Sequence, residues 1–175
     1  MNQTDKISVK TRLSAMLADH IFMCILLIPP IMPFQFMSMA NDSNPLESVW
    51  IFWLLIFVYF NKDGFSSRSK SKRLFGLQII DFRSGQPATT LQCYLRNLTI
   101  PLWPLEVLIS TISPRRRLGD IIAGTSVKST DKLPASSILN DIKSVRFDKQ
   151  AILILPVALI YSLLLNSLIN WMIEI

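Results

Sequence analysis

The stretch Ser113–Thr125, "SPRRRLGDIIAGT", places three consecutive arginines close to an aspartate, directly after the almost uncharged block 98–112. Half of the chain's residues are hydrophobic and its mean hydropathy is +0.39. Moving a charged side chain from water into apolar surroundings costs free energy unless the charge is paired. Both the fold and the function therefore depend on where the charged residues of this stretch lie: Arg115, Arg116, Arg117 and Asp120.

Composition indicates a membrane protein of about one domain, because the 175 residues gather their apolar side chains in blocks. The net charge of +6 comes from basic residues that flank these blocks, and no nucleic-acid-binding motif accompanies them, so we do not expect a nucleic acid partner. Cys24 and Cys93 offer neither a disulfide framework nor metal-ligand spacing, and His20 is the single histidine. We expect no metal and no cofactor.

Three blocks are expected to span the bilayer. The first runs from Leu13 to about Met37 and contains three prolines, which membrane helices tolerate. The second, 46–60, is short and rich in aromatic residues that suit the membrane interface. The third, 151–173, holds 23 uncharged residues, about the length that a spanning helix needs. Asn166 and Asn170 share one face of it, where they could bond a neighbouring helix.

The first block also has features of a signal peptide, because lysines and an arginine precede it and Ser38-Met39-Ala40 resembles a cleavage site. Asp19 and the prolines make a poor hydrophobic region for such a peptide. We therefore expect this block to be retained as a membrane helix.

The loop charges predict the orientation. Residues 61–97 carry seven Lys/Arg against two acids, and residues 113–150 carry eight against four. The positive-inside rule places both stretches and the N-terminus in the cytoplasm of a bacterial cell, and the C-terminus outside. Block 98–112 has arginines at both ends, so we expect it to lie along the interface or to enter the membrane and return. Basic residues beside the apolar blocks are expected to bind anionic lipid: Lys70, Lys72, Arg73, Arg115, Arg116 and Arg117.

The sequence predicts a minor β element on the cytoplasmic side. Leu77–Phe82 is typical of a short strand, the turn 83–86 contains a glycine, and "GTSVKS" after Asp120 is its expected partner strand. The predicted fold class is an all-α membrane protein, a small helical transmembrane bundle with one re-entrant or interfacial segment. We divide it into a membrane domain at 8–130, a cytoplasmic linker at 131–149 and an appended transmembrane helix at 150–175.

Four motifs follow one another along residues 8–130: "RLSAMLADHI", "SKSKRLFGLQIID" with the following Gly-Gln-Pro turn, "LRNL" and "RRRLGDIIAGTSV". In these motifs the chain resembles the RDD family of bacterial membrane proteins, which is named for one arginine and two aspartates. The resemblance places these at Arg12, Asp19 and Asp120. A departure is Ser71, where the family usually has glycine before the lysine that matches Lys72.

For function, the resemblance implies transport, since some relatives look like cation/proton antiporters and most have no assigned activity. The spacing of Arg12 and Asp19 puts both on one face of a helix, about 10 Å apart in height. Asp120 is expected to join them in a charge cluster. Each residue also has a plainer interpretation: Arg12 as a topology anchor, Asp19 as a neutral hydrogen-bonded carboxyl, and Asp120 as a helix N-cap.

Two classes of function remain open from the sequence. In the first, the Arg12, Asp19 and Asp120 cluster exchanges a proton or a small cation, which almost requires a homo-oligomer because one chain has few spans. In the second, the protein is a membrane scaffold or assembly factor and the cluster is structural. No nucleophile–base pair or phosphate-binding loop is present in the sequence, so we do not expect an enzyme.

Overall fold

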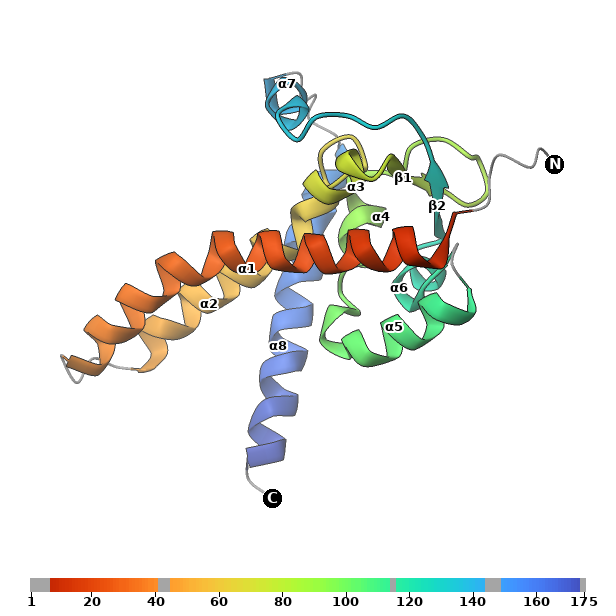
Figure 1. The fold of residues 1–175 in the computed structure, drawn as a ribbon. Coiled ribbons are helices and arrows are strands. Elements are labelled where there is room, and N and C mark those ends of the chain that lie inside the picture. Colours follow the sequence, from red (N-terminus) through yellow and green to blue (C-terminus); the bar gives the residue numbers. More distant parts are fainter. Residues whose placement is uncertain (1–6, 41–44, 114–115, 144–148, 174–175) are drawn as a thin grey trace.

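The computed structural model describes residues 7–40, 45–113, 116–143 and 149–173. The chain is mostly helical, with one small two-stranded sheet (Figure 1). The helices are α1 (Val9–Ala40), α2 (Pro45–Phe60), α3 (Lys70–Leu74), α4 (Thr90–Leu95), α5 (Trp103–Ile112), α6 (Leu118–Ile122), α7 (Ser137–Lys143) and α8 (Ile154–Ile173), with short 3-10 helices η2 (Asn61–Asp63), η3 (Ile100–Leu102) and η4 (Lys149–Leu153); the strands are β1 (Leu77–Asp81) and β2 (Thr125–Ser129).

Helices α1 and α2 lie side by side and extend away from the rest of the molecule, while α8 leaves in another direction (Figure 1). Residues 9–30 of α1 form a helix that is long and apolar enough to cross a membrane, and among the described residues no other helix meets both conditions. The apolar stretches 100–112 and 150–165 are shorter. The bundle of three spans therefore stays a prediction.

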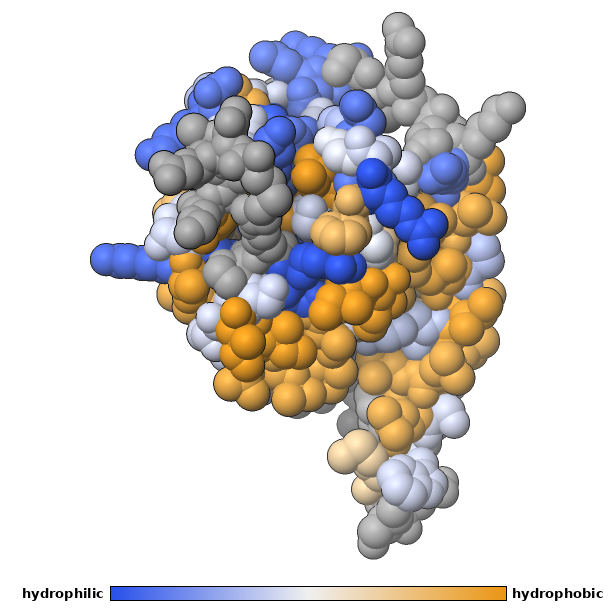
Figure 2. Space-filling view, turned by 90° about the vertical axis from the view of Figure 1, so that its right-hand side faces the viewer, coloured by the Kyte–Doolittle hydropathy of each residue, from blue (hydrophilic) through white to orange (hydrophobic). Residues whose placement is uncertain are grey.

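Helix α5 has its polar side chains inside and its apolar side chains outside. Glu106 and Ser110 are completely buried, whereas Leu108 is 57% and Ile112 is 78% exposed. The hydrophobic surface over α5 and the neighbouring α6 lies below a hydrophilic upper region (Figure 2). Large exposed apolar patches mark surfaces that meet membrane or partners. The pattern matches the membrane contact expected for this segment.

The segment 98–112 starts and ends at nearly the same point. The Nη2 group of Arg117, after the segment, donates to the backbone oxygen of Arg96, before it, at 3.3 Å. The ten residues of α5 rise only about 15 Å, whereas the hydrocarbon core is about 30 Å thick. The two ends of the segment therefore lie close together, and its return within a membrane stays a prediction.

Strands β1 and β2 form the predicted antiparallel pair, with Leu77 opposite Ser129 and Asp81 opposite Thr125. Ile79 is completely buried against Ala88 and Cys93. Gly85 has φ +70°, the left-handed conformation that the predicted turn requires. The strand pairing brings the end of α6 back beside the residues that follow α3.

The last helix is not a separate appendage. Ile154 at its start packs with Phe60 and Tyr94 in one hydrophobic cluster, and the Tyr161 hydroxyl donates to the backbone oxygen of Leu98 at 2.9 Å. The expected linker 131–149 contains helix α7, and Arg73 contacts Asp141 on that helix. The division of the chain at 130 and 149 stays a prediction.

Gly119 allows α6 to approach the backbone after α4. A Cβ at this position would lie 2.0 Å from the oxygen of Arg96 and 2.5 Å from the hydroxyl of Thr99. We predict that Gly119→Ala destabilises the protein in detergent by about 3 kcal/mol or more, measured as a loss of Tm. Gly85→Ala, where only the positive φ opposes a side chain, should cost about 1–2 kcal/mol. Equal Tm values for the two variants would contradict this packing.

Candidate functional site

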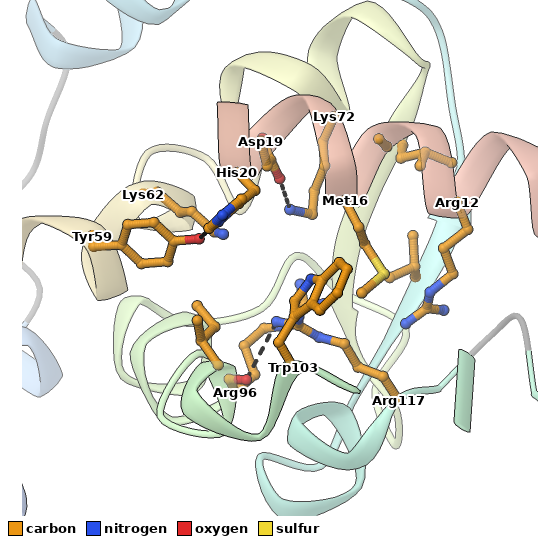
Figure 3. A pocket seen from close by; sticks show the side chains of 14 residues that line it. Arg12, Met16, Asp19, His20, Tyr59, Lys62, Lys72, Arg96, Trp103 and Arg117 are labelled. Carbon is orange, nitrogen blue, oxygen red and sulfur yellow. Dashed lines mark hydrogen bonds and ion pairs between the residues drawn. The ribbon is translucent and has the colours of Figure 1, made fainter. Parts of the chain in front are cut away.

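A cluster of buried charges lies where α1, η2, α3, α4, α5 and α6 meet. Figure 3 labels those of its members that line a small cavity: Arg12, Asp19, Lys72, Arg96 and Arg117. All of its side chains are at most 8% exposed. Burying ions is unfavourable unless each is paired and hydrogen-bonded. Each ion of this charge cluster has an oppositely charged partner within 4.0 Å: its cations are Arg12, Lys72, Arg96 and Arg117, and its carboxylates are Asp19, Asp63, Glu106 and Asp120.

Asp120 is the most heavily bonded carboxylate of the cluster. Its Oδ2 accepts from Arg12 Nη2 at 2.5 Å and from the backbone nitrogen of Arg117 at 3.1 Å. Its Oδ1 lies 2.9 Å from Arg96 Nη2 and accepts from the Thr125 hydroxyl at 3.0 Å. Burial alone would raise the pKa of Asp120, but the charges of Arg96 and Arg12 outweigh it and hold the pKa well below its usual range.

Lys72 is shared by two carboxylates. Its Nζ lies 2.7 Å from Oδ2 of Asp19 on α1 and 2.7 Å from Oδ1 of Asp63 in η2. The third donor contact is to the hydroxyl of Ser69 at 3.2 Å. Ser69 is also the N-cap of α3, so the local helix start fixes the lysine's position. Ser71 is completely buried inside the same helix, where a small side chain is needed.

Arg96 joins the two parts of the cluster. One end of its guanidinium contacts Asp120, and Nη1 lies 3.9 Å from Oδ2 of Asp63. The side-chain nitrogen of Asn97 donates to the same Asp63 oxygen at 3.1 Å. Burial acts to raise the pKa of Asp63, but the Lys72 ammonium and then Arg96 hold it well below its usual range. Both carboxylates therefore remain ionised at neutral pH.

Glu106 ties α5 to the cluster. Its Oε2 pairs with Arg117 Nη1 at 2.6 Å, and its Oε1 accepts from the backbone nitrogen of Gly119 at 3.0 Å and from the hydroxyl of Thr99. Arg117 also donates to the side-chain oxygen of Asn97 at 2.8 Å. The single acid of block 98–112 thus holds its helix against α6.

A small cavity of about 30 Å³ lies inside the cluster, next to Asp19, Lys72 and Arg96 (Figure 3). This volume holds about two water molecules. His20 Nδ1 lies 2.8 Å from the hydroxyl of Tyr59 at one wall. The Lys62 ammonium lies 4.6 Å from the centre of the Tyr59 ring. The cavity therefore touches both charged and aromatic side chains.

The structure brings Arg12 and Asp120 together but gives Asp19 a different ion-pair partner, Lys72. Asp120 is not the N-cap of α6, since Arg117 occupies that position, although Asp120 does accept the Arg117 backbone N–H. The predicted cluster of three was therefore incomplete, because it lacked five members. Lys72, Arg96 and Arg117 lie in the quoted motifs, Asp63 follows an apolar block, and Glu106 is the single acid of block 98–112.

The expectation that Lys72, Arg73 and Arg117 lie at the lipid surface is wrong, because all three are buried. Carboxylates on neighbouring elements supply the counter-charges that make burial favourable. Arg73 contacts Asp141 on α7 and donates to Ser137 at 2.9 Å.

Of the other expected lipid contacts, Lys70 is exposed and Arg115 lies outside the described residues. Arg116 is half-buried, with its guanidinium 4.2 Å from the centre of the Phe82 ring.

In the part of the chain that the structure describes, no group of three or more His, Cys, Asp or Glu side chains could hold a metal ion. Cys93 is buried, and burial raises the pKa of its thiol to about 12. A thiol in that state is a poor nucleophile.

These features define a class: a helical membrane protein that buries its ion pairs and presents apolar side chains outside. The family model of the RDD family matches residues 7–172, nearly the whole chain. The chain belongs to the RDD family, whose members are membrane proteins. The match extends beyond the expected 8–130 and includes most of α8. Comparison with curated proteins and with solved structures found no match.

The cluster predicts an order of stability among variants. Asp120→Asn leaves Arg12 and Arg96 without their shared carboxylate, so it should cost about 3–5 kcal/mol. Asp19→Asn should cost clearly less, because Lys72 keeps its contact with Asp63. The decrease of Tm in detergent measures the loss of stability in both variants.

The exposed Asp131 provides the matched control, and Asp131→Asn should melt like the parent. If Asp120→Asn melts no lower than Asp19→Asn, Asp120 does not hold the cluster together.

Proposed function

We propose that this RDD-family protein exchanges a small monovalent cation for a proton at Lys72, between Asp19 and Asp63. The observation that supports this is the convergence of three oxygen atoms on one cationic nitrogen. Two carboxylate oxygens lie 2.7 Å from Lys72 Nζ, and the Ser69 hydroxyl lies at 3.2 Å. Oxygen atoms of this kind are also the ligands that hard metal cations prefer.

The proposed exchange keeps the charge of the site constant. With Lys72 protonated, two carboxylates face one positive charge. When a cation such as Na⁺ enters between Asp19 and Asp63, Lys72 releases its proton to water and becomes neutral. The site again holds two carboxylates and one positive charge. Departure of the cation and uptake of a proton reverse the step.

The cavity beside Lys72 fits this proposal. Its volume of about 30 Å³ has room for a cation with a water molecule but not for an organic solute. Asp19 lies on the membrane helix α1, and an ionisable residue in such a helix by default marks a pathway or a partner. Asp120, with four bonds and a pKa far below neutral, serves in this proposal as a fixed structural anion.

We also propose that the transporting unit is a homo-oligomer and not an enzyme. Residues 9–30 provide one helix with clear spanning character, and a closed pathway needs more than one. Additional spans in the proposal come from α2, α8 and a second copy of the chain.

A second candidate is a membrane scaffold in which the whole charge cluster is structural. It is favoured by the complete pairing around Asp120, which joins α1 to α4 and α6. In this alternative Asp19 and Lys72 only lock α3 onto α1.

The exchange proposal predicts that vesicles containing the purified protein move protons when a Na⁺, K⁺ or Li⁺ gradient is imposed, measured with an internal pH-sensitive dye. Asp19→Asn should reduce the flux by at least tenfold while the protein stays folded, because one of the two carboxylates is lost. Asp131→Asn is the control and should transport like the parent. Absence of flux from the parent with all three cations would favour the scaffold instead.

The proposed location is the bacterial inner membrane, with several spans and the N-terminus in the cytoplasm. The positive-inside rule then predicts opposite sides for the two points that flank α8. Reporter domains fused after Lys132 and after residue 175 should be active in the cytoplasm and outside it, respectively. Activity of both fusions on the same side would contradict the spanning of α8.

A further inference from the structure

A second hollow, of about 320 Å³, lies between α1 and the end of α2, outside the charge cluster. Its volume is in the range of ligand pockets. One part of its lining is apolar and comes from the two helices, including Phe22, Leu26 and Val58. The other part is polar and comes from η2 and the start of α3: Asn61, Lys62, Ser69 and Lys70.

The polar end of the hollow carries two lysines. Among the described residues neither Lys62 nor Lys70 forms an ion pair; the Lys62 ammonium lies over the Tyr59 ring at 4.6 Å, and Lys70 is exposed. Asp19 also lines the hollow, where Lys72 pairs with it at 2.7 Å and with Asp63 as well. The two lysines are therefore the groups of the lining that can pair with an anion.

We propose that this hollow binds an anionic membrane lipid, with the phosphate of the head group at Lys62 and Lys70 and one acyl chain along Phe22, Leu26 and Val58. The lining combines basic side chains with the apolar walls of α1 and α2, as a lipid combines a charged head group with an apolar chain. Anionic lipids are attracted by basic residues at the cytoplasmic surface, where positive-inside logic places Lys62 and Lys70.

The apolar end favours a lipid over a soluble anion. Leu26 is 55% exposed, and Phe22 and Val58 are also partly exposed, so the hollow opens onto the apolar surface of α1 and α2. Residues 9–30 of α1 are apolar enough to lie in a bilayer. An acyl chain can thus enter the hollow from the membrane and cover its apolar walls, whereas a free phosphate would leave these walls uncovered.

Burial lowers the pKa of Lys62 to about 8, although Asp19 and Asp63 act in the opposite direction. A phosphate beside the ammonium would favour its charged form. This lipid site does not depend on the proposed exchange, and its test measures binding and not flux.

The test is lipid binding to the full-length protein in neutral detergent, measured by native mass spectrometry with phosphatidylglycerol and phosphatidylcholine of identical acyl chains. Phosphatidylglycerol should bind more tightly to the parent. Lys62→Gln and Lys70→Gln should each weaken its binding by about fivefold, as expected for one lysine near a membrane surface. The double variant should bind both lipids alike.

The matched control is the double variant Lys128→Gln with Lys132→Gln, since both lysines are exposed elsewhere and should not affect lipid preference. Equal losses in this control, or unchanged binding by the Lys62/Lys70 variant, would overturn the proposal. If Lys62→Gln fails to fold, the exposed Lys70→Gln decides the matter: unchanged phosphatidylglycerol binding overturns it. Competition by glycerol 3-phosphate at the affinity of the intact lipid would show that the acyl chain contributes nothing, and would also overturn it.

Discussion

The pairing of Asp120 with Arg12 and Arg96 is the contact on which the rest of the structure depends. It joins the first helix to two short helices more than 80 residues later in the chain. Arg96 then reaches Asp63, which shares Lys72 with Asp19. Among the described residues every buried ion has a counter-ion, so removing a shared one leaves another uncompensated at a cost of about 3–5 kcal/mol. The cluster therefore acts as one unit that fixes α1 against α3, α4, α5 and α6.

The same constraint explains the inverted surface of the molecule. Charged side chains from α1, α5 and α6 are gathered inside, so these helices present leucine and isoleucine outward. In water this distribution would be unfavourable, but in a membrane it places each kind of side chain in its preferred surroundings. The segment containing α5 can return to its starting point because Glu106 and the flanking arginines hold both of its ends in the cluster.

The two parts of the cluster differ in what they can do chemically. Around Asp120 each oxygen accepts two bonds, and the elements that donate them are held together. Around Lys72 two carboxylates and a hydroxyl surround one exchangeable positive charge, next to a water-sized cavity. The proposed exchange is therefore assigned to the second part. The hollow beside Lys62 and Lys70 lies on the other side of Asp19, between the cluster and the exposed apolar surface of α1 and α2.

The sequence by itself determined the helical character and the strand pair. Each depends on a local pattern: apolar runs for the helices, and alternation beside a glycine turn for the strands. It also indicated Arg12, Asp19 and Asp120 through a resemblance to the RDD family. Only the tertiary structure decided which cation pairs with which carboxylate. Lys72 and Arg117 look like surface anchors in the sequence, because a basic residue beside an apolar block has the same local pattern whether it faces lipid or a buried carboxylate. Lys72 pairs with Asp63, 9 residues away along the chain, and Arg117 pairs with Glu106, 11 residues away. The folding of the intervening segments brings each pair into contact.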